Sequence, residues 1–149
     1  MGHLIHTEIE IDAPAPLVWE LLTDLAGYER WNPFVQKAEG TIGPGEKLTV
    51  SPRDSSGRSY TFTPTVKQFE EGRLFSWFGS VLHPALMGGD HSFELVPLEG
   101  ARTRLIHDEV FSGLLLPLII LFAANKTRTG FEEMNLAIKQ EAERRALTR

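Results

Sequence analysis

The C-terminal segment from Gly113 to Arg145 restricts the fold more than any other part of the chain. Residues 113–124 contain no charged or polar side chain, whereas Lys, Arg, Glu and Gln become frequent from Asn125 onward. Apolar residues in this charged part recur three and four positions apart, which is the repeat of one helix face: Phe131, Met134, Ile138 and Ala142. Pro117 fits a first helical turn, so we predict one helix of about 30 residues that begins near Leu116.

The apolar run 114–124 is predicted to be buried, because a helical segment that is apolar on all sides needs cover on all sides. The run is too short for a membrane span, which takes about 20 residues. Only the strands that precede it in the chain can supply the cover. We therefore expect a sheet to wrap its concave face around the N-terminal third of the helix.

The rest of the chain divides into one strand, two short helices and six further strands. The first strand, His3–Asp12, alternates with Ile5 and Ile11 on its apolar side. Prolines then introduce a helix that ends at Gly27, and a very short helix, Tyr28–Trp31, follows it. Turn signals separate the six predicted strands at 35–42, 47–51, 60–69, 73–81, 90–97 and 102–111.

Consecutive strands joined by short turns form an antiparallel sheet. The predicted fold is therefore α+β, with a curved sheet of six or seven strands around a long C-terminal helix. No linker or internal repeat interrupts the chain, so we predict a single domain over residues 1–149.

Composition narrows the possible functions. A net charge of −5 argues against a nucleic-acid partner, and the chain has no cysteine. The five histidines lack zinc-ligand spacing, so we predict no metal and no cofactor. No signal peptide precedes the first strand, which favours a cytoplasmic location, and we expect a monomer or weak dimer without a membrane span.

Several short motifs resemble those of one superfamily. They are Ile11–Trp19, Asp24–Tyr28, Trp31–Pro33, Gly89–Phe93, Thr103–His107 and Glu109–Gly113. Together they resemble the SRPBCC superfamily, which includes START-like lipid-binding domains, relatives of the birch-pollen allergen and the polyketide cyclase/dehydratase group. The resemblance implies a helix-grip fold with an apolar cavity. It leaves the function open, because the superfamily contains binders, transporters, enzymes and co-chaperones.

The last predicted hairpin contains the candidate polar site. If its turn pairs Leu98 with Arg102, Phe93 lies opposite His107 and His91 opposite Glu109, on the face that points at the helix. A carboxylate in an apolar cavity needs a partner, so we expect contact between Glu109 and His91. The pair is then a structural brace, a ligand anchor or an acid/base pair, and His91 and Glu109 are the candidate catalytic residues.

Other candidate ligand contacts surround this hairpin. Trp31 either plugs the core or covers the cavity mouth, and Phe62 and Val66 are expected to line the interior. The inward face of strand 73–81 stays undecided. The full set of predicted ligand-binding residues is Trp31, Phe62, Val66, His91, Phe93, His107, Glu109, Leu118 and Phe122.

Three functions remain open. The first is binding of a small, largely apolar, lipid- or polyketide-like molecule between the sheet and the C-terminal helix. The second is a polyketide cyclase or dehydratase that uses His91 and Glu109. The third is an interaction module without a ligand, like the co-chaperone branch; a cavity filled by Phe122, Phe93 and Trp31 would favour it.

Overall fold

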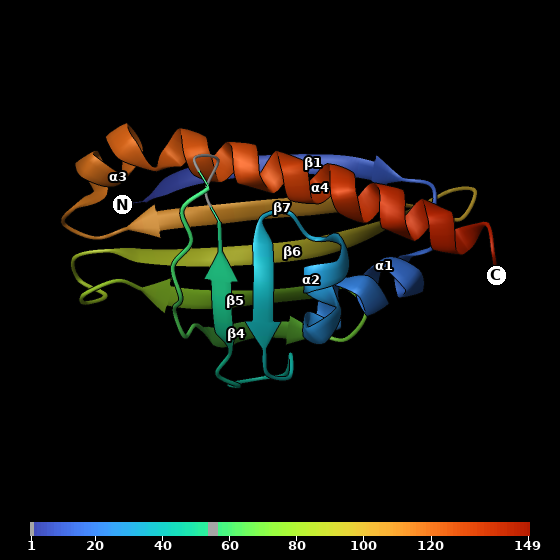
Figure 1. The fold of residues 1–149 in the computed structure, drawn as a ribbon, viewed down its shortest axis with the longest axis horizontal. Helices are drawn as coiled ribbons and strands as arrows, with labels where there is room; N and C mark the ends of the chain where they lie inside the picture. The colour runs from blue at the N-terminus through green and yellow to red at the C-terminus, as the bar shows by residue number, and fades with distance from the viewer. Residues whose placement is uncertain (1, 54–56) are drawn as a thin grey trace.

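The structure, a computed structural model, describes residues 2–53 and 57–149. Its elements in chain order are β1 (His3–Ile11), α1 (Ala15–Thr23), the 3-10 turn η1 (Leu25–Gly27), α2 (Tyr28–Trp31), β2 (Val35–Glu39), β3 (Thr49–Pro52), β4 (Thr65–Glu70), β5 (Leu74–Ser80), β6 (Gly88–Leu98), β7 (Arg102–Ser112), α3 (Leu116–Phe122) and α4 (Ala124–Ala146). Figure 1 shows α4 running diagonally across the curved sheet.

The sheet has two parts. Five antiparallel strands follow the order β1-β7-β6-β5-β4, and β2 pairs with β3 in a separate antiparallel ladder. Isolated bridges between Val50 and Phe62 and between Lys47 and Thr65 connect this ladder to the chain entering β4. The α+β helix-grip fold with a curved sheet around a long C-terminal helix is therefore confirmed, with the seven strands divided five and two.

The core lies between the sheet and the apolar stripe of α4. Phe131, Met134, Ile138 and Ala142 are all fully buried, as their spacing predicts. Helix α1 packs against α4, β6 and β7. Its residues Val18, Leu21 and Leu22 are also buried. The stripe of α4, rather than the apolar run before it, fills the concave face of the sheet.

The single long helix predicted from residue 116 is in fact two helices. Ala123, with φ −122°, ends α3, and α4 starts at Ala124. The prediction that the sheet covers the run 114–124 is wrong, since within that run only Ile119 and Ala124 are buried. The break lets α3 lie at the end of the sheet where β7 stops (Figure 1). Most of its residues are exposed.

Candidate functional site

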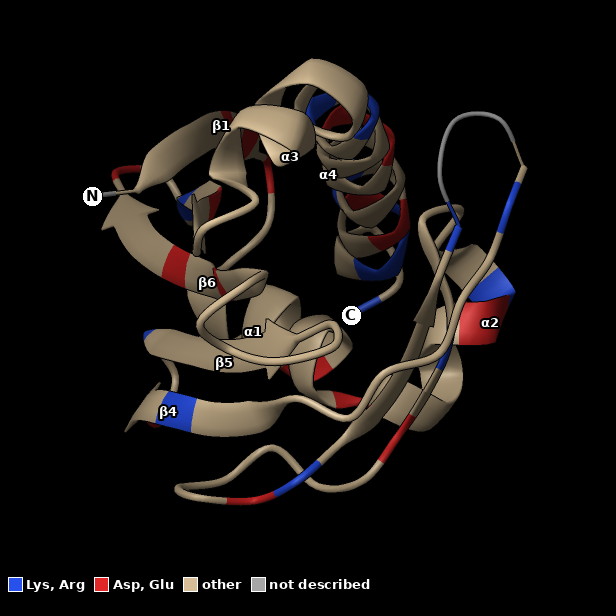
Figure 2. Cartoon of the chain, turned by 90° about the vertical axis from the view of Figure 1, so that its left-hand side faces the viewer, with Lys and Arg blue, Asp and Glu red and all other residues tan. Residues whose placement is uncertain are grey.

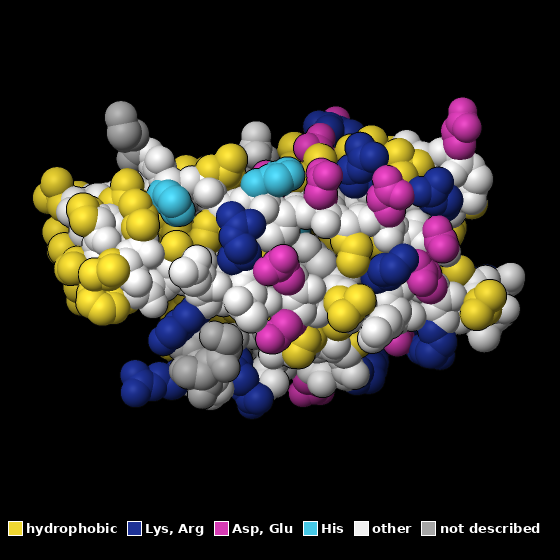
Figure 3. Space-filling view, turned by 90° about the horizontal axis from the view of Figure 1, so that it is seen from above, with side chains coloured by type: hydrophobic (Ala, Val, Ile, Leu, Met, Phe, Trp, Pro, Cys, Tyr) yellow, Lys and Arg dark blue, Asp and Glu magenta, His cyan; other side chains and the backbone are white. Residues whose placement is uncertain are grey.

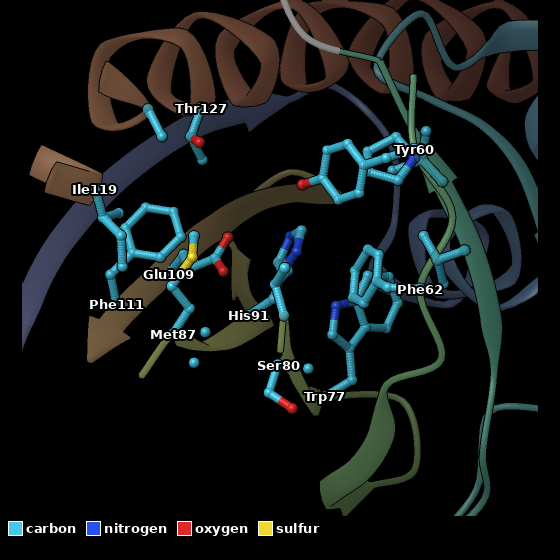
Figure 4. Close-up of a pocket in the computed structure, with 18 of the residues that line it drawn as sticks. Tyr60, Phe62, Trp77, Ser80, Met87, His91, Glu109, Phe111, Ile119 and Thr127 are labelled. Atoms are coloured by element: carbon cyan, nitrogen blue, oxygen red, sulfur yellow. The ribbon is translucent and has the colours of Figure 1, made fainter. Parts of the chain in front are cut away.

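A cavity of about 130 Å³ lies between the sheet, the β2–β3 ladder and the junction of α3 with α4. Its wall is mostly apolar and aromatic. The lining residues are Phe34, Val35, Val50, Pro52, Tyr60, Phe62, Trp77, Gly79, Ser80, Val81, Met87, Gly88, Gly89, His91, Glu109, Phe111, Ile119, Ala123 and Thr127. Figure 4 shows His91 and Glu109 side by side on the floor of this pocket, with Thr127 above them.

Strand β5 supplies the aromatic floor beside His91. It pairs with β6 so that Phe75 faces Phe93 and Trp77 faces His91, which turns this face of β5 inward. Gly79 continues the same face, and a Cβ atom there would lie 2.6 Å from the ring of Phe62. Glycine at this position therefore lets the Phe62 ring lie directly against the strand and form one wall of the pocket.

The register of the β6–β7 hairpin is confirmed. His91 pairs with Glu109, and Phe93 with His107, following the pairing of Leu98 with Arg102. The side chain of Glu109 lies against Gly89, where an added Cβ would come within 2.1 Å of its Oε2 atom. Protein atoms surround its carboxyl group, and its remaining exposure is to the pocket.

Burial, followed by the negative charge of Asp90, raises the pKa of Glu109 to about 8. The carboxyl group is therefore largely protonated at neutral pH and can donate a hydrogen bond. Within the described residues it makes no hydrogen bond or ion pair. An unpaired buried acid on the floor of a pocket is a frequent mark of a functional site.

The expected contact between His91 and Glu109 is wrong. His91 bonds instead to His107, with Nε2 atoms 2.7 Å apart, and His107 Nδ1 lies 2.7 Å from Asn135 Oδ1. Asn135 Nδ2 donates to Thr7 Oγ1 over 2.9 Å, and that hydroxyl donates to the His107 carbonyl over 2.6 Å. The physical reason is that helix α4 places the Asn135 amide beside His107 Nδ1, which leaves His107 Nε2 as an acceptor for His91 Nε2–H.

This chain of bonds determines where the protons lie. The hydroxyl hydrogen of Thr7 is used on the His107 carbonyl, so Thr7 must accept from the amide nitrogen of Asn135. Asn135 Oδ1 then accepts from His107 Nδ1–H, which leaves Nε2 of His107 as the acceptor for His91 Nε2–H. Nδ1 of His91 is therefore a hydrogen-bond acceptor without a partner among the described residues.

Aromatic rings hold both imidazoles in place. His107 lies between Phe93 and Phe131, with ring centroids 4.4 and 3.9 Å away, and His91 stacks on Phe131 at 4.6 Å. Burial lowers the pKa of His107, and burial together with the neighbouring His107 lowers the pKa of His91. Both rings are therefore neutral at physiological pH.

Of the nine predicted ligand-binding residues, Phe62, His91 and Glu109 line the pocket. Val66, Phe93 and His107 point inward as expected but are buried in the core below it.

Three of the predicted positions lie elsewhere. Trp31 packs on Tyr28, with ring centroids 5.3 Å apart, and so supports the core rather than the pocket. Leu118 and Phe122 are 52% and 68% exposed, because the break at Ala123 turns these side chains away from the sheet. Their predicted contact with a ligand in this cavity is not supported by their positions.

Sequence reasoning missed most of the wall. Phe111 could have been found, because it shares a strand face with His107 and Glu109, whereas the sequence pattern does not decide whether Trp77 faces inward. Phe34 and Tyr60 belong to the segments around the β2–β3 ladder, whose position over the pocket follows from tertiary contacts alone. Thr127 could have been found as well, because it lies four residues before Phe131 and so extends the predicted stripe of the helix.

These features define a class of protein: a helix-grip domain of the SRPBCC type with an apolar pocket and two polar groups on its floor. The chain belongs to the polyketide cyclase/dehydrase and lipid transport family, whose model matches residues 3–143. No curated protein matches the chain.

Solved structures agree with this fold. The Zhui aromatase/cyclase from Streptomyces sp. R1128 superimposes with a TM-score of 0.80 at 21% identity, over 97% of this chain and 96% of that one. A START superfamily protein from Mycobacterium smegmatis gives a TM-score of 0.75 at 20% identity, over 96% and 99% of the two chains. The di-domain ARO/CYC protein BexL gives 0.68 at 19% identity, over 99% of this chain and 51% of that one. At these identities the likeness shows the fold alone.

Neither metal ligation nor a membrane span is visible in what the structure describes. No group of three or more His, Asp or Glu residues within 2–53 and 57–149 is arranged to hold a metal ion. In the same ranges no helix is both long and apolar enough to cross a bilayer.

Proposed function

We propose that this protein binds a small, largely apolar molecule in the pocket between the sheet and the α3–α4 junction. The observation that carries the proposal is an apolar, aromatic cavity whose floor presents two unpartnered polar groups, Glu109 and His91 Nδ1. Binding pockets in general combine apolar walls with a few polar groups that set orientation. The family's description, which includes lipid transport and polyketide cyclisation, supports a ligand of this kind.

The two polar groups complement each other. Protonated Glu109 can donate to a carbonyl or ether oxygen, while His91 Nδ1 can accept from a hydroxyl group. A ligand that offers both an acceptor and a hydroxyl at one end would satisfy the two groups at once. We therefore propose an oxygenated head at the floor of the pocket and a hydrocarbon or aromatic body against Phe62, Trp77 and Phe111.

The size of the cavity limits what enters without rearrangement. A cavity of about 130 Å³ is close to the volume that holds a single aromatic ring in engineered apolar cavities, roughly 150 Å³. Tyr60 and Val81, which are 55% and 45% exposed, belong both to the wall of the pocket and to the surface of the protein. A longer ligand would extend past these residues toward solvent.

A bulky side chain at Thr127 should abolish binding. Thr127 faces the pocket from α4, so Thr127→Trp fills the space that a ligand would use. Ligand-observed NMR with phenol and toluene tests this, and phenol should bind the wild-type protein about 2- to 10-fold more tightly because of its hydrogen bond at the floor. Thr129→Trp, at an exposed position on the same helix, is the control and should bind both compounds normally. Equal binding by all three proteins would place the compounds outside the pocket.

A second candidate is an enzyme of the cyclase/dehydrase kind, favoured by the proton that Glu109 can exchange near neutral pH. In such a step His91 Nδ1 would take a proton from an activated carbon while the Glu109 O–H bonds to the adjacent carbonyl oxygen. The lowered pKa of His91 makes it a weak base, so we rank this candidate below binding.

Proton exchange distinguishes the two. Ethyl acetoacetate incubated in D₂O should gain deuterium at C2 faster with the wild-type enzyme than with Glu109→Gln or His91→Phe, if the second candidate holds. A pure binding protein should leave the exchange rate at its buffer value in all three samples.

The third possibility, a module without a ligand, lacks support. Phe93 lies below the cavity, and Phe122 and Trp31 lie away from it, so none of the three fills the space. We further propose that the protein works in the cytoplasm, since a chain without cysteine suits a reducing compartment.

A further inference from the structure

One end of the molecule exposes a continuous group of large apolar side chains, which we call the apolar end. Its members and their exposed fractions are Leu82 (82%), Leu114 (78%), Leu118 (52%), Leu121 (72%) and Phe122 (68%). Figure 3 shows these hydrophobic side chains gathered at the left-hand end of the molecule, beyond the charged surface of α4. Single exposed apolar residues are ordinary, but a contiguous group of this kind usually marks an interaction site.

Two separate chain segments form the apolar end and are bonded to each other. The loop between β5 and β6 accepts hydrogen bonds at the carbonyls of Ala85 and Leu86 from the backbone N–H groups of Leu114 and Leu115, over 2.9 and 3.0 Å. Gly113, with φ +111°, lies so close that a Cβ atom would meet the Leu86 oxygen at 2.3 Å. The loop and α3 therefore present their apolar side chains from one connected unit.

The same unit forms part of the pocket on its inner side. Ile119 and Ala123 line the cavity from the α3–α4 junction, and Val81 and Met87 line it from the loop. Leu82, which is 82% exposed, follows Val81 directly, so the apolar end begins next to the wall of the pocket. A ligand leaving the pocket on this side would pass over apolar side chains.

The two chain segments that form the apolar end carry no acidic residue. Neither residues 74–89 nor residues 110–131 contain an aspartate or glutamate, although the whole chain has a net charge of −5. Lys126 and Arg128 follow α3 at exposed positions on the first turns of α4. Viewed from this end, α3 carries no charged residue, while α4 carries both basic and acidic residues (Figure 2).

We propose that the apolar end docks on the surface of a bilayer that contains anionic lipid, with Leu121 and Phe122 inserted among the acyl chains and the cations against the headgroups. Apolar side chains next to cations have the chemistry of an interfacial membrane contact, in which the helix lies on the bilayer and does not span it. A second copy of the chain fits less well, because a two-fold contact would present the same cations on both sides. Docking in this way brings the opening of the pocket to the lipid phase, where an apolar ligand can enter without crossing water.

Vesicle flotation tests the proposal directly. The wild-type protein should float with vesicles of phosphatidylcholine and phosphatidylglycerol, and less with phosphatidylcholine alone or at high salt. Leu121→Ser/Phe122→Ser should weaken binding roughly tenfold or more, because two large apolar side chains no longer insert. Lys126→Glu should remove most of the preference for the anionic vesicles.

A matched control removes two exposed leucines outside the apolar end. Leu136→Ser/Leu147→Ser alters side chains that are 52% and 88% exposed and should bind vesicles like the wild type. Thermal melts of all variants should agree with the wild type, since the altered side chains already face solvent. Vesicle binding is measured without a pocket ligand, and Thr127→Trp should still float, so a failure here is separate from a failure of the proposed function.

Three results would overturn the docking proposal. The first is no flotation of the wild-type protein with either vesicle. The second is equal flotation of the wild type and Leu121→Ser/Phe122→Ser. The third is a lipid-free dimer of the wild type that becomes monomeric in that variant, which would show that a second copy covers the apolar end.

Discussion

Replacing Glu109 by glutamine should remove a loss of stability that the wild-type protein shows as the pH rises from about 6.5 to 8. The pKa of Glu109 is raised to about 8 in the folded state, from an ordinary value of 4.5. Between these two values the folded protein keeps a proton that the unfolded chain releases, so the free energy of unfolding falls as the pH rises. The expected wild-type loss is on the order of 1–2 kcal/mol, up to about 1.4 kcal/mol per pH unit.

Chemical denaturation at several pH values measures this difference. Glu109→Gln lacks this carboxyl group and should not show the loss, whereas Glu99→Gln, in the turn between β6 and β7, should retain the wild-type slope. Below pH 6.5 all three proteins should lose stability, because the lowered pKa values of His91 and His107 make the unfolded chain bind protons first, and Glu109→Gln should lose it most steeply because it lacks the opposing effect of Glu109. A wild-type slope in Glu109→Gln would mean that the carboxyl group is ionised in the pocket.

Asn135→Leu should destabilise the protein by about 2–4 kcal/mol, which corresponds to a fall in Tm of roughly 5–15 °C. Asn135 is 3% exposed and bonds both His107 Nδ1 and Thr7 Oγ1. Leucine has a similar volume but leaves the His107 N–H buried without an acceptor, which is the costly part of the change. Thermal and denaturant unfolding measure the effect.

A second substitution separates the lost bond from lost packing. In Asn135→Leu/His107→Phe both partners are apolar, and the phenyl ring can take the place of the imidazole between Phe93 and Phe131. The double variant should therefore be less destabilised than the sum of the two single changes. Strict additivity would show that Asn135 and His107 do not support each other in the folded protein.

The register of β6 and β7 was predictable because the turn and the alternation of apolar residues indicate the same strand pairing. The turn at Leu98–Arg102 and the alternation of Phe93 and Leu105 are enough to place His91 opposite Glu109. The partner that His91 actually takes was not predictable in this way. It depends on Asn135, which lies 28 residues beyond His107 and reaches it only because α4 crosses the sheet at this point.

The helix break was hidden for a different reason. The break lies at an alanine, and alanine favours a continuous helix, unlike glycine or proline. The sequence around Ala123 therefore gives no signal that separates α3 from α4. Hydrophobicity predicts that a segment avoids water, but not whether protein or another apolar phase provides the cover. The same reasoning predicts that Leu118 and Phe122 lie in the pocket, whereas the protein itself leaves both side chains exposed.

The position of Trp77 gives the pocket an optical signal of its own. Of the three tryptophans, Trp77 lines the cavity, with its ring centroid 4.8 Å from that of His91, while Trp19 donates to Glu71 and Trp31 packs on Tyr28. An indole in this place changes its emission when water leaves the cavity or when the neighbouring imidazole gains a proton. Occupancy of the pocket can therefore be followed by fluorescence of the unlabelled protein.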